Sequence, residues 1–142
     1  MPDPLDPLFR HKKSYKRKKR PRNNLEQLCV DLLNSTSGWI AGRCDCKMGL
    51  ASRDMFGFAD VFAFEPDGST ELLIQVTSVG NHAARRTKCL LSEIARRWVE
   101  SGHLLDVWSL KDFVNGTEFE HWKVERLTQE MFDGQDTEPI AS

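Results

Sequence analysis

An α/β fold with a mixed central sheet is predicted for this chain of 142 residues. Helix-like and strand-like patterns follow one another in the order αβββαββ, which favours a sheet with helices packed on its faces. The segment 71–77 (ELLIQVT) is almost wholly apolar, as expected for a strand that is buried on both faces. The length suits a single domain with one core.

The first half of the chain predicts one helix and three strands. Asn23 and Asn24 can cap a helix that runs to about residue 35. Its apolar stripe consists of Leu25, Leu28, Cys29, Leu32 and Leu33. Strands are expected at 38–47, 59–65 and 71–77, with a loop at 49–58 and a turn at 66–69 (PDGS).

The second half predicts a long helix, two further strands and a short helix. The long helix covers 82–101 and ends at Gly102. The strands are expected at 104–110 and 119–127, and the short helix near 128–132. The folded domain then spans 23–132, between an N-terminal arm (1–22) and a frayed C-terminal tail (133–142).

The arm is strongly basic. Nine of the thirteen residues 10–22 are Lys or Arg, whereas residues 23–142 carry eleven Lys and Arg against nineteen Asp and Glu, a net charge of −8. Such a block cannot bury itself, so we expect it to be disordered alone and to bind the phosphates of DNA. The predicted contacts are Lys12, Lys13, Lys16, Arg17, Lys18, Lys19, Arg20 and Arg22. A solubilising arm or a nuclear-import signal would have the same composition.

The four cysteines match a zinc pattern poorly. They form one C-x-C (Cys44 and Cys46) and no C-x-x-C, so buried thiols are expected, although a Cys44–Cys46 half-site stays open. No apolar run approaches the ~20 residues of a membrane helix, so no membrane partner is expected. The N-terminus has no hydrophobic segment after its charges, which favours an intracellular, cytoplasmic location, with nucleoid-associated or phage-encoded settings open.

Two predicted strands joined by the PDGS turn carry the residues with most chemical content. Asp60 opens the first strand, after Gly57-Phe58-Ala59, and Gln75-Val76-Thr77 closes the second. Between Glu26 and about Trp108 the chain resembles the PD-(D/E)XK nuclease superfamily of restriction enzymes and Holliday-junction resolvases. It looks particularly like phage and bacterial nuclease-like proteins that read FG-x-x-D…IQVTS…NHAAR. The resemblance implies a restriction-endonuclease-like sheet, DNA as substrate, Mg²⁺ or Mn²⁺ as cofactor, and often a homodimer.

The resemblance also implies a site. Residues i and i+2 of a strand project to the same face, so positions 75 and 77 lie together, and a hairpin can place Asp60 beside them. Mg²⁺ prefers hard oxygen donors, and the expected ligands are Glu26, Asp60, Gln75 and the Val76 main chain. The expected catalytic residues are Asp60, Gln75, Thr77 and Lys88.

The chain departs from the E-x-K pattern of that superfamily at two positions, because Gln75 replaces the acid and Thr77 replaces the lysine. A substitute cation is available on the predicted long helix. One face of that helix carries Ala84, Lys88, Leu91, Ala95 and Trp98. An inward Lys88 can reach the space beside residue 77, whereas a snorkelling Lys88 would bury only its methylenes. Arg85, one turn earlier, suits a phosphate oxygen.

Several of these residues have structural alternatives. Asp60 at the mouth of an apolar strand needs a partner, which a metal, a helix N-terminus or Arg53 could supply. Asp54 falls in the loop, where a solvated side chain is the expected outcome and a secondary metal role or a DNA-contacting role of the loop stays open. Asn81 and His82 are expected to cap the long helix, and a DNA contact or a role as a base stays open for His82.

Three functions are compatible with this pattern. The first is a Mg²⁺-dependent DNA endonuclease that hydrolyses phosphodiester bonds with metal-activated water. The second is a nuclease fold that has lost cleavage and binds nucleic acid or a partner protein, which the Q-x-T sequence favours. The third is a protein-binding module that the basic arm merely targets.

Overall fold

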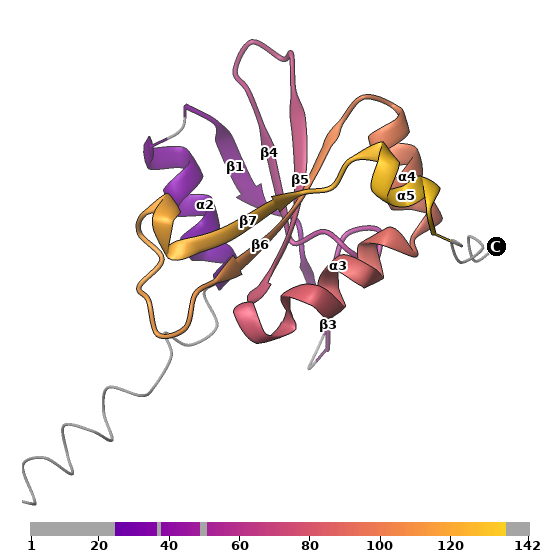
Figure 1. The fold of residues 1–142 in the computed structure, drawn as a ribbon. Helices are drawn as coiled ribbons and strands as arrows, with labels where there is room; N and C mark the ends of the chain where they lie inside the picture. The colour runs from indigo at the N-terminus through magenta and orange to yellow at the C-terminus, as the bar shows by residue number, and fades with distance from the viewer. Residues whose placement is uncertain (1–24, 37, 49–50, 136–142) are drawn as a thin grey trace, which may run out of the picture.

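The computed structural model describes residues 25–36, 38–48 and 51–135 (Figure 1). The predicted arm, the asparagines predicted to cap the first helix (Asn23 and Asn24) and most of the predicted tail lie outside these ranges. The helices are α2 (Leu25–Thr36), α3 (His82–Leu90), α4 (Glu93–Glu100) and α5 (Gln129–Asp133). The strands are β1 (Ile40–Arg43), β2 (Cys46–Met48), β3 (Ala51–Arg53), β4 (Val61–Phe64), β5 (Glu71–Ser78), β6 (Leu104–Leu110) and β7 (Trp122–Arg126).

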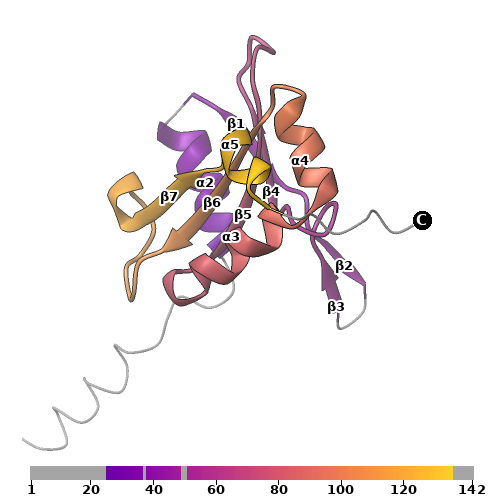
Figure 2. The ribbon, with the colours of Figure 1, turned by 45° about the vertical axis from the view of Figure 1, so that its right-hand side comes forward.

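Five strands form one mixed sheet in the order β1-β4-β5-β6-β7. The pair β5–β6 is parallel, and the other three pairs are antiparallel. The parallel pair needs a crossover connection, which α3 and α4 supply. The predicted mixed α/β architecture is therefore confirmed. A separate two-stranded hairpin, β2–β3, projects from the body (Figure 2).

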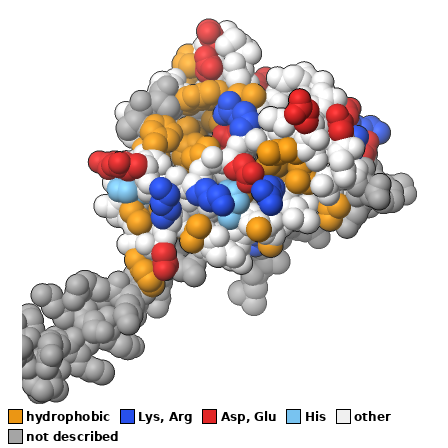
Figure 3. All heavy atoms as spheres, viewed as in Figure 1, with side chains coloured by type: hydrophobic (Ala, Val, Ile, Leu, Met, Phe, Trp, Pro, Cys, Tyr) orange, Lys and Arg blue, Asp and Glu red, His pale blue; other side chains and the backbone are white. Residues whose placement is uncertain are grey.

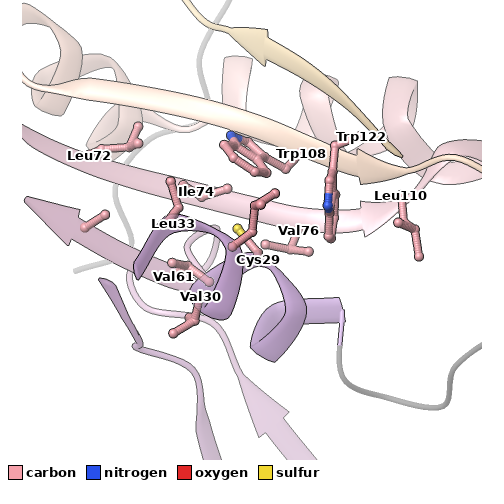
Figure 4. Packing of buried hydrophobic residues seen from close by; sticks show 12 residues of the cluster. Cys29, Val30, Leu33, Val61, Leu72, Ile74, Val76, Trp108, Leu110 and Trp122 are labelled. Atoms are coloured by element: carbon pink, nitrogen blue, oxygen red, sulfur yellow. The ribbon is translucent and has the colours of Figure 1, made fainter. Parts of the chain in front are cut away.

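Helices cover both faces of the sheet (Figures 1 and 2). On one face, Cys29 and Leu33 of α2 pack against alternate strand residues such as Ile74 and Trp108 (Figure 4). On the other face, α3, α4 and α5 pack against Leu73, Leu105 and Val107. Because β5 is buried on both faces, its apolar run is explained as the sequence predicts. The predicted stripe of α2 faces the core, with Cys29, Leu32 and Leu33 buried.

The predicted strand 38–47 is wrong as a single unit, because the chain leaves the sheet after β1. The last pair between β1 and β4 is Arg43 with Val61, where β4 begins. One more backbone bond follows, from the Cys44 N–H to the Asp60 carbonyl at 2.9 Å, and the chain then turns away and forms β2 with β3. The predicted loop 49–58 is corrected in the same way, since β3 lies within it.

The predicted long helix 82–101 is also wrong as a single unit. It breaks at Leu91 and Ser92, and the Ser92 hydroxyl accepts a hydrogen bond from the backbone N–H of Ala95 at 3.2 Å, which caps a new helix. The stripe predicted across both halves is wrong too, because Ala84 and Lys88 are exposed. The side chains that α3 buries are His82, Cys89 and Leu90.

The remaining elements follow the prediction closely. Strand β6 has the predicted bounds, α5 lies within one residue of its predicted place, and Gly102 ends α4 with a φ of 90°. The predicted strand 119–127 is shorter, because Phe119–His121 forms a single 3-10 turn before β7. None of the helices in the described ranges is long and apolar enough to cross a membrane.

Candidate active site

The site forms where β5 runs past the end of β4. The two strands pair from Val61–Ile74 to Phe64–Glu71, and the Asp60 N–H donates the last ladder bond to the Ile74 carbonyl at 2.9 Å. Strand β5 continues to Ser78, beyond the point where β4 begins. The backbone edge of its last residues is therefore not paired with β4. Asp60 and Gln75 are therefore placed together by the register of one hairpin, as the sequence predicts.

The side chain of Asp60 binds to that unpaired edge of β5. Its Oδ2 accepts a hydrogen bond from the Gln75 Nε2 at 2.6 Å and another from the Val76 backbone N–H at 2.8 Å. The carboxyl thus replaces the ladder partner that β4 no longer provides. The structure describes the backbone of Arg53 but not its side chain, so the alternative that Arg53 satisfies Asp60 lies outside the described atoms.

A cleft of about 680 Å³ opens at this point. Residues from four separate parts of the chain line it: α2, the loop before β4, β5 and α3. The lining residues are Glu26, Asp54, Gly57, Asp60, Gln75, Val76, Arg85 and Lys88. The predicted convergence of side chains 26, 60, 75 and 88 is therefore present in the structure.

Gln75, which lines this cleft, has an unused and buried acceptor. The residue is 2% exposed, its amide nitrogen is bound to Asp60, and its Oε1 has no hydrogen-bond partner among the described residues. An unpaired buried carbonyl costs about 1–3 kcal/mol, so such an atom calls for a ligand. The Val76 carbonyl faces the same edge as its N–H, since both groups of a strand residue point to one side.

Two carboxyl groups share the centre of the cleft. Burial, followed by a hydrogen bond with the Asp54 carboxyl and the charges of Asp54 and Glu26, raises the pKa of Asp60 to about 8, against a lowering by the Val76 N–H. A raised pKa of this origin means that Asp60 holds its proton more tightly than a free aspartate does. Asp54 is not simply solvated, because its side chain lines the cleft beside Asp60, which agrees with the alternative left open for it.

Lys88 reaches this pair from α3. Its Nζ lies 3.3 Å from the Asp54 Oδ2, although 41% of the lysine side chain is exposed. The predicted inward face of the helix is wrong, but the ammonium still lies at the cleft, because the long side chain bends to Asp54. Arg85 lines the cleft from the preceding turn, as expected.

The donor set suits a hard divalent cation. The cleft carries three carboxyls (Glu26, Asp54 and Asp60) and two cationic side chains (Arg85 and Lys88), so full ionisation leaves an excess negative charge. The uncharged donors are the orphaned Gln75 carbonyl and the Val76 main chain. Mg²⁺ and Mn²⁺ prefer such oxygen ligands, so the residues present fit the ion implied by the sequence.

Thr77 does not line the cleft. It is 6% exposed and follows Gln75 on the same face of β5, yet the structure places it outside the group of lining residues. The cationic side chain at the cleft comes instead from α3, where Lys88 and Arg85 are lining residues. The predicted catalytic role of Thr77 therefore has no support from the geometry, and the predicted contacts in the arm lie outside the described residues.

A second polar group joins α3, β6 and β7. His82 is 3% exposed, its Nδ1 lies 2.7 Å from the Ser109 Oγ, and its Nε2 lies 2.8 Å from the Glu125 Oε1. Arg86 donates to the other oxygen of Glu125 at 3.2 Å. Although this resembles a hydrolytic triad in composition, Ser109 is 0% exposed and cannot meet a substrate. Asn81 occupies the predicted cap position of α3, although its side chain makes no capping hydrogen bond, and His82 anchors α3 to the sheet.

The face over β7 and α3 mixes basic with acidic side chains (Figure 3). Arg126 is paired with the buried Asp106 at 2.8 Å, and Arg86 with Glu125. These cations are therefore committed to internal ion pairs. The cleft is the better candidate for contact with a phosphate.

Comparison with family models, curated proteins and solved structures finds no match to this chain. The function is therefore inferred from the geometry of the cleft.

Proposed function

We propose that this chain is a divalent-metal-dependent DNA endonuclease with a variant PD-(D/E)XK site. The observation that carries the proposal is the Gln75 Oε1, a buried acceptor without a partner among the described residues, next to the Asp54–Asp60 pair. A cation placed there would satisfy the carbonyl and relieve the repulsion of the two carboxyls. One ligand thus accounts for both unfavourable features.

The arrangement of elements supports the same proposal. Glu26 comes from the helix before the sheet, Asp60 from the start of β4, Gln75 from β5 and Lys88 from the helix after it. This is the order in which the PD-(D/E)XK pattern supplies its site residues. The restriction-endonuclease-like form of the sheet and the homodimer implied by the resemblance remain part of the proposal.

The roles of the residues follow from their charges. Asp54, Asp60 and Glu26 would hold the cation with the Gln75 and Val76 carbonyls, and the bound ion would lower the pKa of water and neutralise charge on the phosphate. Arg85 would bind a non-bridging phosphate oxygen. The Lys88 ammonium is paired with Asp54, and the phosphate or the attacking water would compete with Asp54 for it. Lys88 would therefore move from Asp54 to the phosphate or to the water. The basic arm would hold the DNA at a distance from the cleft.

The test is cleavage of a mixture of duplex, gapped and branched DNA with Mg²⁺ or Mn²⁺. We expect cutting that stops in EDTA and falls at least about 100-fold in Asp60→Ala, as expected for loss of a metal ligand. Asp31→Asn is the control, because Asp31 is an exposed acid on α2 outside the cleft. Metal-dependent cutting that survives Asp60→Ala would show that the nuclease is a contaminant.

The second candidate is a binding protein of the same fold that does not cleave. It is favoured by one observation, the ion pair of Lys88 with Asp54, which occupies the substitute cation. Under this function DNA binding would be unchanged in Asp60→Ala, lost on deletion of residues 10–22, and accompanied by no cutting with either metal. The same set of experiments therefore separates the two functions.

A further inference from the structure

Phe56 is the neighbour in the chain of a residue that lines the cleft. It lies in the turn that leads from Asp54 to Asp60, and its neighbour Gly57 lines the cleft together with Asp54. The turn is closed by hydrogen bonds from the Gly57 N–H to the Asp54 carbonyl and from the Phe58 N–H to the Met55 carbonyl, both at 3.1 Å. The turn between Asp54 and Asp60 is therefore held in a defined conformation.

The backbone of Phe56 is strained. Its φ is 58° and that of Gly57 is 81°, which is the signature of a type I′ turn. Gly and Asn suit both central positions of that turn, whereas a bulky residue is disfavoured there. A phenylalanine at this position therefore gives up local stability.

The ring is also exposed. Phe56 is 50% exposed, while the ring of Phe58, centred 6.2 Å away in a stacked orientation, is 1% exposed. Phe58 supports one side of the Phe56 ring, and part of Phe56 is left open to solvent. A strained and exposed aromatic ring does not contribute to the core, and one that lies next to a cleft is placed to meet a ligand there.

We propose that Phe56 stacks on a nucleobase next to the phosphodiester held in the cleft, and that the preferred DNA has an unpaired base beside the bond that is cut. The inference rests on the proposed nuclease function and deepens it, since it names the substrate class. A base inside an intact duplex is already covered on both faces, whereas an unpaired base can leave the stack. Every base offers a flat π-face, so such stacking selects DNA structure and not sequence.

The experiment is a cycle of two DNA ligands and two proteins. The ligands are a duplex with one unpaired base beside the mapped cut and the same duplex with an abasic position there. Dissociation constants are measured by fluorescence anisotropy in Ca²⁺, and cleavage rates in Mn²⁺. The variant is Phe56→Gly, because glycine adopts a φ of 58° without strain and keeps the turn.

Phe113 provides a matched control. It is 57% exposed and has a φ of 59°, but it lines a separate hollow with Ser78 and Lys111. We expect Phe56→Gly to weaken binding of the unpaired-base duplex by about 5- to 150-fold, the range of one base–aromatic stack. Binding of the abasic duplex should be unchanged, Phe113→Gly should resemble the unsubstituted chain, and Phe56→Trp should retain the preference.

The other outcomes overturn the inference in distinguishable ways. If the unsubstituted chain cuts DNA but Phe56→Gly binds and cuts both ligands equally well, the stacking is wrong and the nuclease function stands. If Phe56→Gly weakens both ligands equally, or Phe113→Gly has the same effect, the loss does not come from a stack on that base. If the unsubstituted chain neither binds nor cuts any DNA, both the proposed function and the stacking are wrong.

Discussion

Replacing Asp60 with asparagine should stabilise the metal-free protein, and increasingly so as the pH rises. The pKa of Asp60 is raised to about 8 in the folded chain from an ordinary value of 3.8, because of burial and of the neighbouring Asp54 carboxyl. The folded chain therefore binds this proton more tightly than the unfolded chain. The stabilisation that the Asp60 proton contributes is fully present below pH 3.8 and is lost as the pH rises towards 8. An asparagine side chain is not charged at any pH, so Asp60→Asn removes that fall.

The size of the effect follows from the shift. Each pH unit between 3.8 and 8 costs at most about 1.4 kcal/mol, so the upper limit between pH 5 and pH 8 is roughly 4 kcal/mol. The cleft is open to solvent, which reduces the cost of the charge, and we expect roughly 2 kcal/mol. The asparagine can still accept hydrogen bonds from Gln75 and Val76, so few other contacts change.

Thermal unfolding of both proteins at pH 5, 6, 7 and 8 in EDTA measures the effect. We expect the melting temperature of Asp60→Asn to exceed that of the unsubstituted chain by several degrees more at pH 8 than at pH 5. Mg²⁺ or Mn²⁺ at pH 8 should raise the melting temperature of the unsubstituted chain and have little effect on Asp60→Asn. A constant difference across the pH series, with Asp31→Asn as control, would refute the assignment of a buried, protonated carboxyl.

Three further perturbations test the fold and the arm. His82→Ala should lower the free energy of unfolding by about 2–4 kcal/mol, since it leaves the buried Ser109 hydroxyl without its partner and Glu125 with Arg86 alone, whereas His121→Ala at a partly exposed position should change it by less than about 1 kcal/mol in denaturant titrations. Gly116→Ala should cost about 1–3 kcal/mol, because the new methyl would lie 3.1 Å from Leu28 Cδ1 on a backbone with φ of 80°; Gly42→Ala, with open space around it, is the control. Deleting residues 10–22 should weaken DNA binding and flatten its dependence on salt by close to one unit per lost phosphate contact, and an unchanged slope would exclude the arm from the interface.

The sequence predicts the parts of this fold that depend on regular patterns. The apolar run of β5 and the bounds of β6 are readable because buried strands leave continuous hydrophobic segments. The meeting of Asp60 and Gln75 is readable as well, because a tight PDGS turn between two strands fixes their register. The core face of α2 follows from its helical periodicity.

The parts that could not be predicted depend on contacts across the chain. Residues 82–101 keep a helical composition through Leu91 and Ser92, and the break is decided by the Ser92 cap and by packing on both helices. The end of β1 is set by where β4 begins, which is a property of the partner strand. Asp54 looks like a solvated loop residue, because only the turn at 54–59 brings its carboxyl to Asp60.

The short length of α3 has a consequence for precision in the cleft. Its nine residues are clamped at one end by the His82 contacts to β6 and β7, and at the other by Cys89 and Leu90 in the core. Arg85 and Lys88 therefore lie on a short helix whose two ends are both anchored. This anchoring restricts the direction from which their side chains enter the cleft and how far they reach into it. A substitution at His82 should thus make the positions of both cationic side chains in the cleft less well defined, although His82 contacts neither of them.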